Sequence, residues 1–223
     1  MASALKAVLL DLDGTLVDSI PGIHQALTHA LAPYPDADCQ LADVRRWVGN
    51  GPARLVERAL AHNDLTADQA SVLSDFSSAY AETLYNGTLY PGVTAGLDTL
   101  AKAGLLLACI TNKPSPFTRP YLAHLGIDQV MKTVICADEV AQPKPHPESL
   151  ILACERLGVD TAEAVMVGDS VNDLKPAQTL GMQRLAVTYG YHQDAEMAVH
   201  EPTALMDDFP AVVNWCLRQT GTD

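Results

Sequence analysis

From residue 105 onward, short apolar runs alternate with segments whose apolar residues recur at helical spacing, and this alternation constrains the fold most strongly. The runs lie at 105–110, 133–136, 164–167 and 183–187, and the helical segments at 116–125, 147–157 and 172–180. Strands that alternate with helices form βαβ units, in which the strands are parallel and helices cover both faces of the sheet. The pattern predicts an α/β fold with a doubly wound parallel sheet, a Rossmann-like core, which a short strand at 203–206 and a helix at 208–218 complete.

An apolar run at residues 5–10 predicts one further strand, but a long helical region separates it from the others. Helices are expected at 19–32, 41–48, 52–62 and 67–85, the last with Phe76 and Tyr80 on one apolar stripe, and no convincing strand is found between residues 18 and 89. The segment YPGV at 90–93 then begins a helix that ends at Gly104. We therefore expect a core domain made of residues 1–17 and 90–223, with an inserted all-helical cap domain of residues 18–89.

The first apolar run ends in DLDGT, which places two carboxylates, Asp11 and Asp13, directly after a buried strand. Burying a carboxylate without a partner is costly. Asp-Gly between apolar residues is a strong hairpin signal, so a simple turn is one interpretation. The helical periodicity of 19–32 weakens it, because no alternating strand follows at once. The other interpretation is a site in which a cation and a phosphorus atom lie between the two carboxylates.

The predicted strand at 164–167 also ends in acidic residues, within the segment GDSVND. Ligands of open parallel sheets bind at the carboxyl ends of the strands, so Asp169 and Asp173 are expected near Asp11. Carboxylates that converge in a confined space need a cation, and hard oxygen ligands suit Mg²⁺. We expect Asp11 and Asp169 to bind the ion together with a backbone oxygen of Asp13, and Asp173 to bind it directly or through water. The structural alternative is that Asp169 or Ser170 only caps the following helix.

Two more polar residues are expected at the same edge of the sheet. Thr111 follows the strand at 105–110, where its hydroxyl can donate a hydrogen bond to a phosphoryl oxygen. Lys144 lies between two prolines, whose restricted backbone would aim its ammonium at a fixed point. The alternatives are an ordinary hydroxyl at a strand end and a solvated surface lysine.

Composition limits the partners of the chain. With 14 Lys and Arg against 27 Asp and Glu, the formal net charge is -13, which disfavours nucleic acid and anionic membrane surfaces as partners. No segment approaches the roughly 20 apolar residues of a membrane span, and Asp11 interrupts the only apolar run near the N-terminus. The five cysteines form no close pair, which favours reduced thiols and a cytoplasmic location. We expect a small phosphorylated metabolite as partner, and a monomer or a homodimer.

The order of the segments DLDGT, TNK, KPHP and GDSVND resembles the four motifs of the haloacid dehalogenase superfamily of phosphohydrolases. Together with WVGNG and PGV, they are similar to its phosphoglycolate phosphatase branch. The resemblance implies that Asp11 attacks phosphorus and becomes an aspartyl phosphate, and that Asp13 is the general acid and base. It further implies that Mg²⁺ assists and that Thr111 and Lys144 hold the transferring group.

The same resemblance assigns the choice of substrate to the cap and to the second motif. The expected substrate-binding residues are Asn112, Gly49, Asn50, Gly51 and Arg45. The leading hypothesis is hydrolysis of 2-phosphoglycolate to glycolate and phosphate. A phosphosugar phosphatase, including one for an amino-sugar 6-phosphate, would share the core chemistry. A non-catalytic phosphate-binding protein is disfavoured, because neither the nucleophile nor a metal carboxylate is missing from the sequence.

Overall fold

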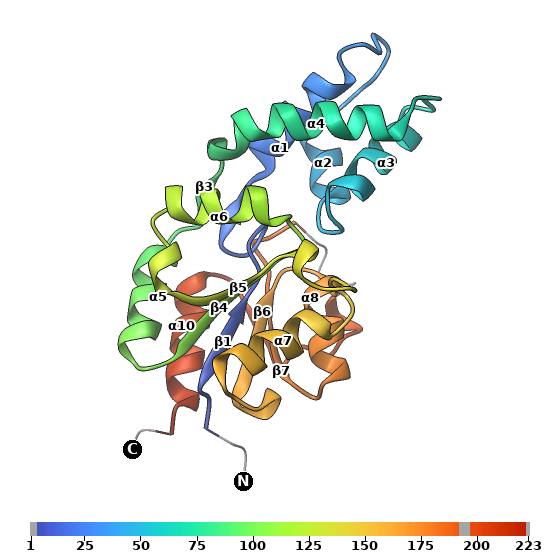
Figure 1. The fold of residues 1–223 in the computed structure, drawn as a ribbon. Coiled ribbons are helices and arrows are strands. Elements are labelled where there is room, and N and C mark those ends of the chain that lie inside the picture. The colour runs from blue at the N-terminus through green and yellow to red at the C-terminus, as the bar shows by residue number, and fades with distance from the viewer. Residues whose placement is uncertain (1–3, 192–196, 222–223) are drawn as a thin grey trace.

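A computed structural model describes residues 4–191 and 197–221 of the chain. Its main sheet has six parallel strands in the order β5-β4-β1-β6-β7-β8, which confirms the predicted doubly wound α/β fold (Figure 1). The chain builds the sheet outward from β1 in one direction and then returns to build it in the other. The strands of this sheet are β1 Ala7–Leu10, β4 Leu106–Ile110, β5 Met131–Ile135, β6 Ala164–Gly168, β7 Gln183–Val187 and β8 Ala204–Met206.

The central strand is buried on both faces because side chains alternate along it. Val8 and Leu10 pack in one apolar cluster with helices α5 and α10, whereas Ala7 and Leu9 pack in a second with α7 and α8. All four side chains are fully buried. The helices of the core domain are α5 Val93–Lys102, α6 Ser115–His124, α7 Glu148–Leu157, α8 Val171–Thr179 and α10 Phe209–Gln219, with single 3₁₀ turns at Asp128–Val130, Ala137–Glu139 and Thr161–Glu163.

The segment between β1 and α5 is mostly helical and lies above the carboxyl ends of the strands (Figure 1). Val44, Val56, Val72 and Phe76 are buried in it, so this part of the chain contributes its own apolar packing. Its helices are α1 Ile20–Leu31, α2 Leu41–Trp47, α3 Pro52–His62 and α4 Gln69–Thr83, followed by a 3₁₀ turn at Leu84–Asn86. We call this segment the cap; the domain limits at residues 18 and 89 remain a prediction.

One feature of the cap differs from the sequence expectation. A two-residue strand, β2 Val17–Asp18, pairs antiparallel with β3 Thr88–Leu89, so residues 18–89 are not wholly free of strand. Strands of two residues are too short to show an alternating pattern. The pair also shows that the hairpin interpretation of Asp-Gly is wrong, because β2 pairs with β3 and not with β1. The two chain crossings between core and cap therefore lie side by side.

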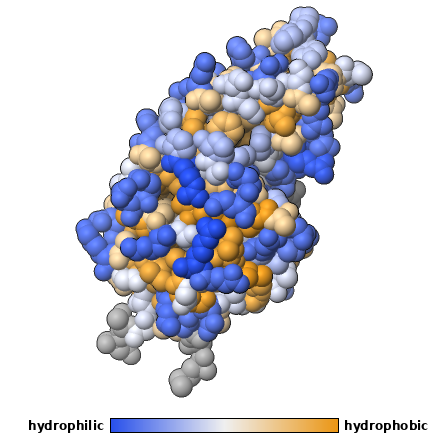
Figure 2. Space-filling view, viewed as in Figure 1, coloured by the Kyte–Doolittle hydropathy of each residue, from blue (hydrophilic) through white to orange (hydrophobic). Residues whose placement is uncertain are grey.

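The surface shows where the two parts of the molecule differ. Figure 2 shows more apolar surface over the core domain and a mostly hydrophilic surface over the cap.

Within the described residues, no helix combines the length and the apolar character that crossing a membrane requires.

Candidate active site

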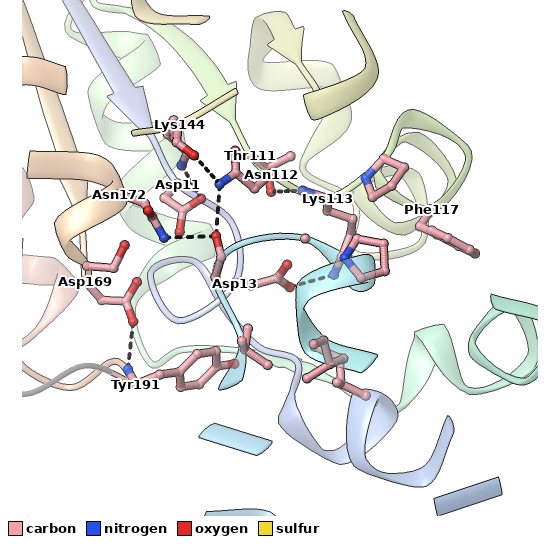
Figure 3. A pocket seen from close by; sticks show the side chains of 18 of the residues that line it. Asp11, Asp13, Thr111, Asn112, Lys113, Phe117, Lys144, Asp169, Asn172 and Tyr191 are labelled. Atoms are coloured by element: carbon pink, nitrogen blue, oxygen red, sulfur yellow. Dashed lines mark hydrogen bonds and ion pairs between the residues drawn. The ribbon is translucent and has the colours of Figure 1, made fainter. Parts of the chain in front are cut away.

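The site lies where the order of the strands reverses. β1 is hydrogen-bonded to β4 on one side and to β6 on the other, and the loops after these three strands meet at the carboxyl edge of the sheet (Figure 3). Asp11, Thr111 and Asp169 each follow one of the three strands directly. Their convergence follows from parallel strands in adjacent positions.

A tight turn directs Asp11 and Asp13 into the site. The backbone N–H of Val17 donates to the carbonyl of Leu12 at 3.0 Å, and that of Gly14 donates to the carbonyl of Val17 at 2.9 Å. Gly14 has φ +90°, and a Cβ at this position would lie 2.7 Å from Cγ of Asp169. Glycine is required here both by its backbone conformation and by the carboxylate packed against it.

Lys144 joins two of the carboxylates. Its Nζ donates to Oδ1 of Asp11 at 2.7 Å, to Oδ1 of Asp173 at 2.6 Å and to the carbonyl of Ile110 at 2.6 Å. All three residues are buried, with exposed fractions of 4%, 8% and 0% for Lys144, Asp11 and Asp173. Burial opposes the charge of Lys144, but the two carboxylates outweigh it, so the pKa of Lys144 lies above its usual value.

Neighbouring groups shift the pKa of Asp11 in opposite directions. Burial and the Asp173 carboxylate raise the pKa of Asp11, Lys144 lowers it, and the net effect raises the pKa to about 7. The pKa of Asp169 is also raised, by burial first and then by Asp11 and Asp173. A carboxyl group with such a pKa is a common feature of a functional site, because a substrate or a cation normally completes the charge balance.

The carboxylates fit a divalent cation. Asp11, Asp169 and Asp173 each offer an oxygen, and these three oxygens lie within 4.8 Å of one another. Oδ2 of Asp169 accepts a hydrogen bond from the backbone N–H of Tyr191 at 2.7 Å, which fixes the direction of this carboxylate (Figure 3). Hard carboxylate oxygens are the ligands that Mg²⁺ prefers, and positive charge between them would lower the raised pKa values.

Asp173 has a structural role as well. Its Oδ2 accepts from the backbone N–H of Ser170 at 3.1 Å and from the Ser170 hydroxyl at 2.7 Å, which caps helix α8, while Oδ1 accepts from Lys144. Both oxygens are thus engaged by protein donors. This arrangement favours a contact with a cation through water, the second of the two possibilities that the sequence left open.

Thr111 and Asn112 shape the opposite wall of the site. The Thr111 side chain is 4% exposed, and its Oγ1 accepts from the backbone N–H of Lys113 at 3.1 Å. Nδ2 of Asn112 donates to the carbonyl of Lys144 at 2.8 Å and to the carbonyl of Gly49 at 2.9 Å. Asn112 therefore connects the core loop that carries Lys144 to the cap loop that carries Gly49.

A second buried lysine, Lys113, lies beside Asp13, and no role for it was expected from its sequence position. Nζ of Lys113 donates to Oδ1 of Asp13 at 2.6 Å and to the hydroxyl of Tyr80, on cap helix α4, at 2.8 Å. Burial opposes its charge, but Asp13 and Tyr80 outweigh it, so the pKa of Lys113 is raised. The only signal in the sequence was its position after a strand end, which is weak because most lysines are solvated.

The cap closes over these groups and forms a cavity. Its lining includes Asp11, Asp13, Thr111, Asn112, Lys144, Asp169 and Asp173 from the core, and Gly49 and Gly51 from the cap loop. The carbonyl of Gly49, which accepts from Asn112, also accepts from Nδ2 of Asn172 of the core at 3.1 Å. Nine of the eleven site residues expected from the sequence thus border one cavity.

The other two expected residues lie outside this cavity. Arg45 forms an ion pair with Asp18 at 3.5 Å. Asn50 hydrogen-bonds to Asn172 at 3.1 Å and accepts from Arg58 at 2.8 Å. Their assignment to substrate binding stays a prediction. Of the two, Asn50 joins the cap to helix α8 of the core through its hydrogen bond to Asn172.

Known proteins of similar sequence and structure point to one family. The model of haloacid dehalogenase-like hydrolases matches residues 5–181. A phosphoglycolate phosphatase of Yersinia pestis is 41% identical over 212 residues, 92% of this chain and 90% of that protein. One of Psychrobacter arcticus is 36% identical over 223 residues, 96% of each chain.

A solved structure agrees with the sequence relatives. A protein of Haemophilus somnus 129pt, described as a predicted phosphoglycolate phosphatase, superimposes with a TM-score of 0.90 at 31% identity, covering 96% of this chain and 98% of that one. The resemblance drawn from the four motifs is thereby confirmed. The chain belongs to the haloacid dehalogenase-like hydrolases.

Proposed function

We propose that this chain is a Mg²⁺-dependent phosphatase that hydrolyses 2-phosphoglycolate to glycolate and phosphate. The observation that carries the chemistry is the placement of Asp11, Asp13 and Lys144 around one cavity, with Asp11 and Lys144 in direct contact at 2.7 Å. A nucleophile, a second carboxylate and a fixed cation are the groups that a two-step phosphoryl transfer needs. The names of the relatives support the choice of ester.

In the first step an oxygen of Asp11 forms a bond to phosphorus while the bond from phosphorus to the ester oxygen breaks. The electron pair of that bond goes to the ester oxygen, and Asp13 supplies the proton that makes it an alcohol. In the second step a water molecule attacks the phosphorus of the aspartyl phosphate. Asp13 takes the proton from this water, and the bond between Asp11 and phosphorus breaks to release phosphate.

Other residues hold the transferring group. Lys144 can neutralise negative charge on the phosphoryl oxygens, and the Thr111 hydroxyl can donate a hydrogen bond to one of them. Mg²⁺ would be held by Asp11, Asp169 and the backbone of Asp13. Asp173 would contact it through water. When bound, the ion supplies positive charge that neutralises and orients the phosphoryl oxygens.

The lining of the cavity favours a small leaving group over a phosphosugar. The side chains that the described part of the cap contributes to the lining are mostly apolar. Apart from glycine and proline, they are Ile23, Val48, Leu55, Phe76 and Tyr80. Of these five, only Tyr80 has a polar side-chain atom. A sugar would lose hydrogen bonds to water against such a surface without regaining them. A leaving group with one methylene and one carboxylate has a single polar end, and the lining offers that charge a buried ammonium, Lys113.

Turnover of a panel of phosphate esters tests this proposal. We expect 2-phosphoglycolate to give the highest kcat/KM, loss of activity with a chelator, and loss in the variant Asp11→Asn. The matched control is Asp160→Asn, since Asp160 lies at the 3₁₀ turn before β6 and not in the cavity lining. A higher kcat/KM for a sugar phosphate would reject the proposed substrate, and full activity of Asp11→Asn would reject the nucleophile.

A further inference from the structure

The ammonium group of Lys113 lies at the boundary between core and cap, inside the cavity. Its side chain is buried, with 6% of the residue exposed, although it follows the strand end that also supplies Thr111. Nζ donates to Asp13 at 2.6 Å and to Tyr80 at 2.8 Å, and it lies 5.3 Å and 5.2 Å from the ring centres of Tyr80 and Tyr121. In residues 4–191 and 197–221 no third hydrogen-bond acceptor for it is found. An ammonium has three N–H groups, so one donor remains for a ligand.

The position of Asp13 sets the distance from Lys113 to the leaving group. To protonate the ester oxygen, a carboxyl oxygen of Asp13 must approach it to about 3 Å. In 2-phosphoglycolate a single methylene separates this ester oxygen from the carboxylate, whose oxygens then lie within about 4 Å of it. Because Nζ of Lys113 is 2.6 Å from Oδ1 of Asp13, a substrate held by Asp13 can turn its carboxylate into hydrogen-bond reach of the ammonium.

The other cations near the site are already engaged. Lys144 contacts Asp11 and Asp173, and it faces the phosphoryl end of the substrate. Three arginines of the cap, Arg45, Arg46 and Arg54, do not border the cavity. They pair with Asp18, Asp43 and Glu57. Within the described residues, Lys113 and Lys144 are the cationic side chains of the lining.

We propose that Lys113 binds the carboxylate of the leaving group and thereby selects phosphate esters of 2-hydroxycarboxylates. A carboxylate that enters this apolar cavity loses its hydration, and the buried ammonium replaces part of it with a charge-assisted hydrogen bond. Tyr80 holds the lysine from the cap side, so the contact forms between the closed cap and the core. This inference rests on the proposed function, because it assumes that Asp13 faces the ester oxygen.

The test compares 2-phosphoglycolate with its neutral isostere 2-phosphoglycolamide, in which an amide replaces the carboxylate. For each enzyme the readout is the ratio of the two kcat/KM values. Wild type is expected to prefer the carboxylate, and Lys113→Met to lower this ratio by about a hundredfold, the loss typical of one buried charge-assisted contact. A role of Lys113 only in positioning Asp13 would lower both kcat/KM values equally and leave the ratio unchanged.

Two further variants separate the charge from its surroundings. Lys113→Arg retains a cation and is expected to restore most of the preference. Tyr80→Phe removes a hydrogen-bond partner of the lysine but keeps the ammonium, so it should keep the preference for the carboxylate. Lys102→Met is the surface control, since Lys102 pairs with Asp98 on the exposed side of α5.

The outcomes distinguish this inference from the proposed function. If wild type does not hydrolyse 2-phosphoglycolate, the proposed substrate and this inference both fail. If wild type hydrolyses it and Lys113→Met keeps the wild-type ratio, only the inference fails. Should Lys113→Met not fold, a crystal structure of Asp11→Asn with 2-phosphoglycolate decides: a carboxylate oxygen within hydrogen-bond distance of Lys113 Nζ supports the inference, and a carboxylate bound elsewhere overturns it.

Discussion

Replacing Lys144 with methionine removes the cation that Asp11 and Asp173 share. The ammonium donates to both carboxylates and to the carbonyl of Ile110, all at 2.6–2.7 Å, and none of the three side chains is substantially exposed. Methionine retains most of the volume of the lysine stem, so the change removes charge and hydrogen bonds more than packing. Two buried carboxylates then face each other without a counter-charge.

Removing one partner of a buried ion pair typically costs about 3–5 kcal/mol. For a chain of this length each kcal/mol shifts Tm by about 2–4 °C, so the metal-free variant is expected to melt roughly 6–20 °C below wild type. Turnover is expected to fall about 10²–10³-fold, because a fixed donor to the transferring group is lost.

The loss of folding stability in Lys144→Met should be larger at high pH than at low pH. The pKa of Asp11 is raised to about 7, chiefly by burial, so its ion pair with Lys144 is present only above this pH. Metal-free Lys144→Met should therefore lose more stability at pH 8 than at pH 5.5. Lys144 itself remains charged over this range, because its pKa is raised from an already high value.

Thermal unfolding in the presence of a chelator at the two pH values measures this difference. Lys102→Met is the control for loss of an exposed lysine and should shift Tm by no more than a degree or two, since an exposed pair contributes about 0–1 kcal/mol. A destabilisation below about 1 kcal/mol that is equal at both pH values would refute the reasoning from buried charge.

Three other changes probe the site. Gly14→Ala places a Cβ against the Asp169 carboxylate and should weaken Mg²⁺ binding at least about tenfold. The control is Gly104→Ala, which has a similar φ of +86° but no atom within 4 Å of the added Cβ, so it should only destabilise the fold. Calorimetry of Mg²⁺ binding compares the two variants. Protons compete with the ion for Asp11, whose pKa is raised to about 7, so Mg²⁺ affinity measured by titration calorimetry should fall as pH drops below 7; constant affinity from pH 5.5 to 8 would argue against Asp11 as a ligand. Asp13→Asn should lower kcat/KM for alkyl phosphates by about 10²–10⁴ but much less for p-nitrophenyl phosphate, whose leaving group needs no proton. The readout is kcat/KM because it excludes the second step, in which Asp13 acts as base for both esters; equal losses of kcat/KM would remove the acid role.

The sheet and the main site could be predicted because both follow from local patterns. Buried parallel strands appear as apolar runs, and parallel strands present their carboxyl ends at one edge, so Asp11, Thr111 and Asp169 had to converge. The strand pair β2–β3 could not be predicted, since two residues carry no periodicity. The pair depends on the fold of the whole cap, which places its two ends side by side.

The contacts between cap and core could not be predicted from the sequence either. Tyr80 belongs to the apolar stripe of a predicted helix, which suggested a place in the cap interior; its ring is buried as expected, but its hydroxyl reaches Lys113 of the core. Arg45 was expected to bind substrate, and its ion pair with Asp18 was not foreseen. Such pairings depend on how the cap lies over the core, a property that no local pattern encodes.

The configuration at phosphorus tests the central claim most directly, namely that Asp11 attacks the ester before water does. A thiophosphate ester whose phosphorus carries sulfur, 16O and 18O can be hydrolysed by the wild-type protein with Mg²⁺ in 17O-labelled water, and the configuration of the released chiral thiophosphate determined. Two successive in-line displacements, one by Asp11 and one by water, predict retention of configuration. Inversion would show a single direct attack by water and would contradict the account.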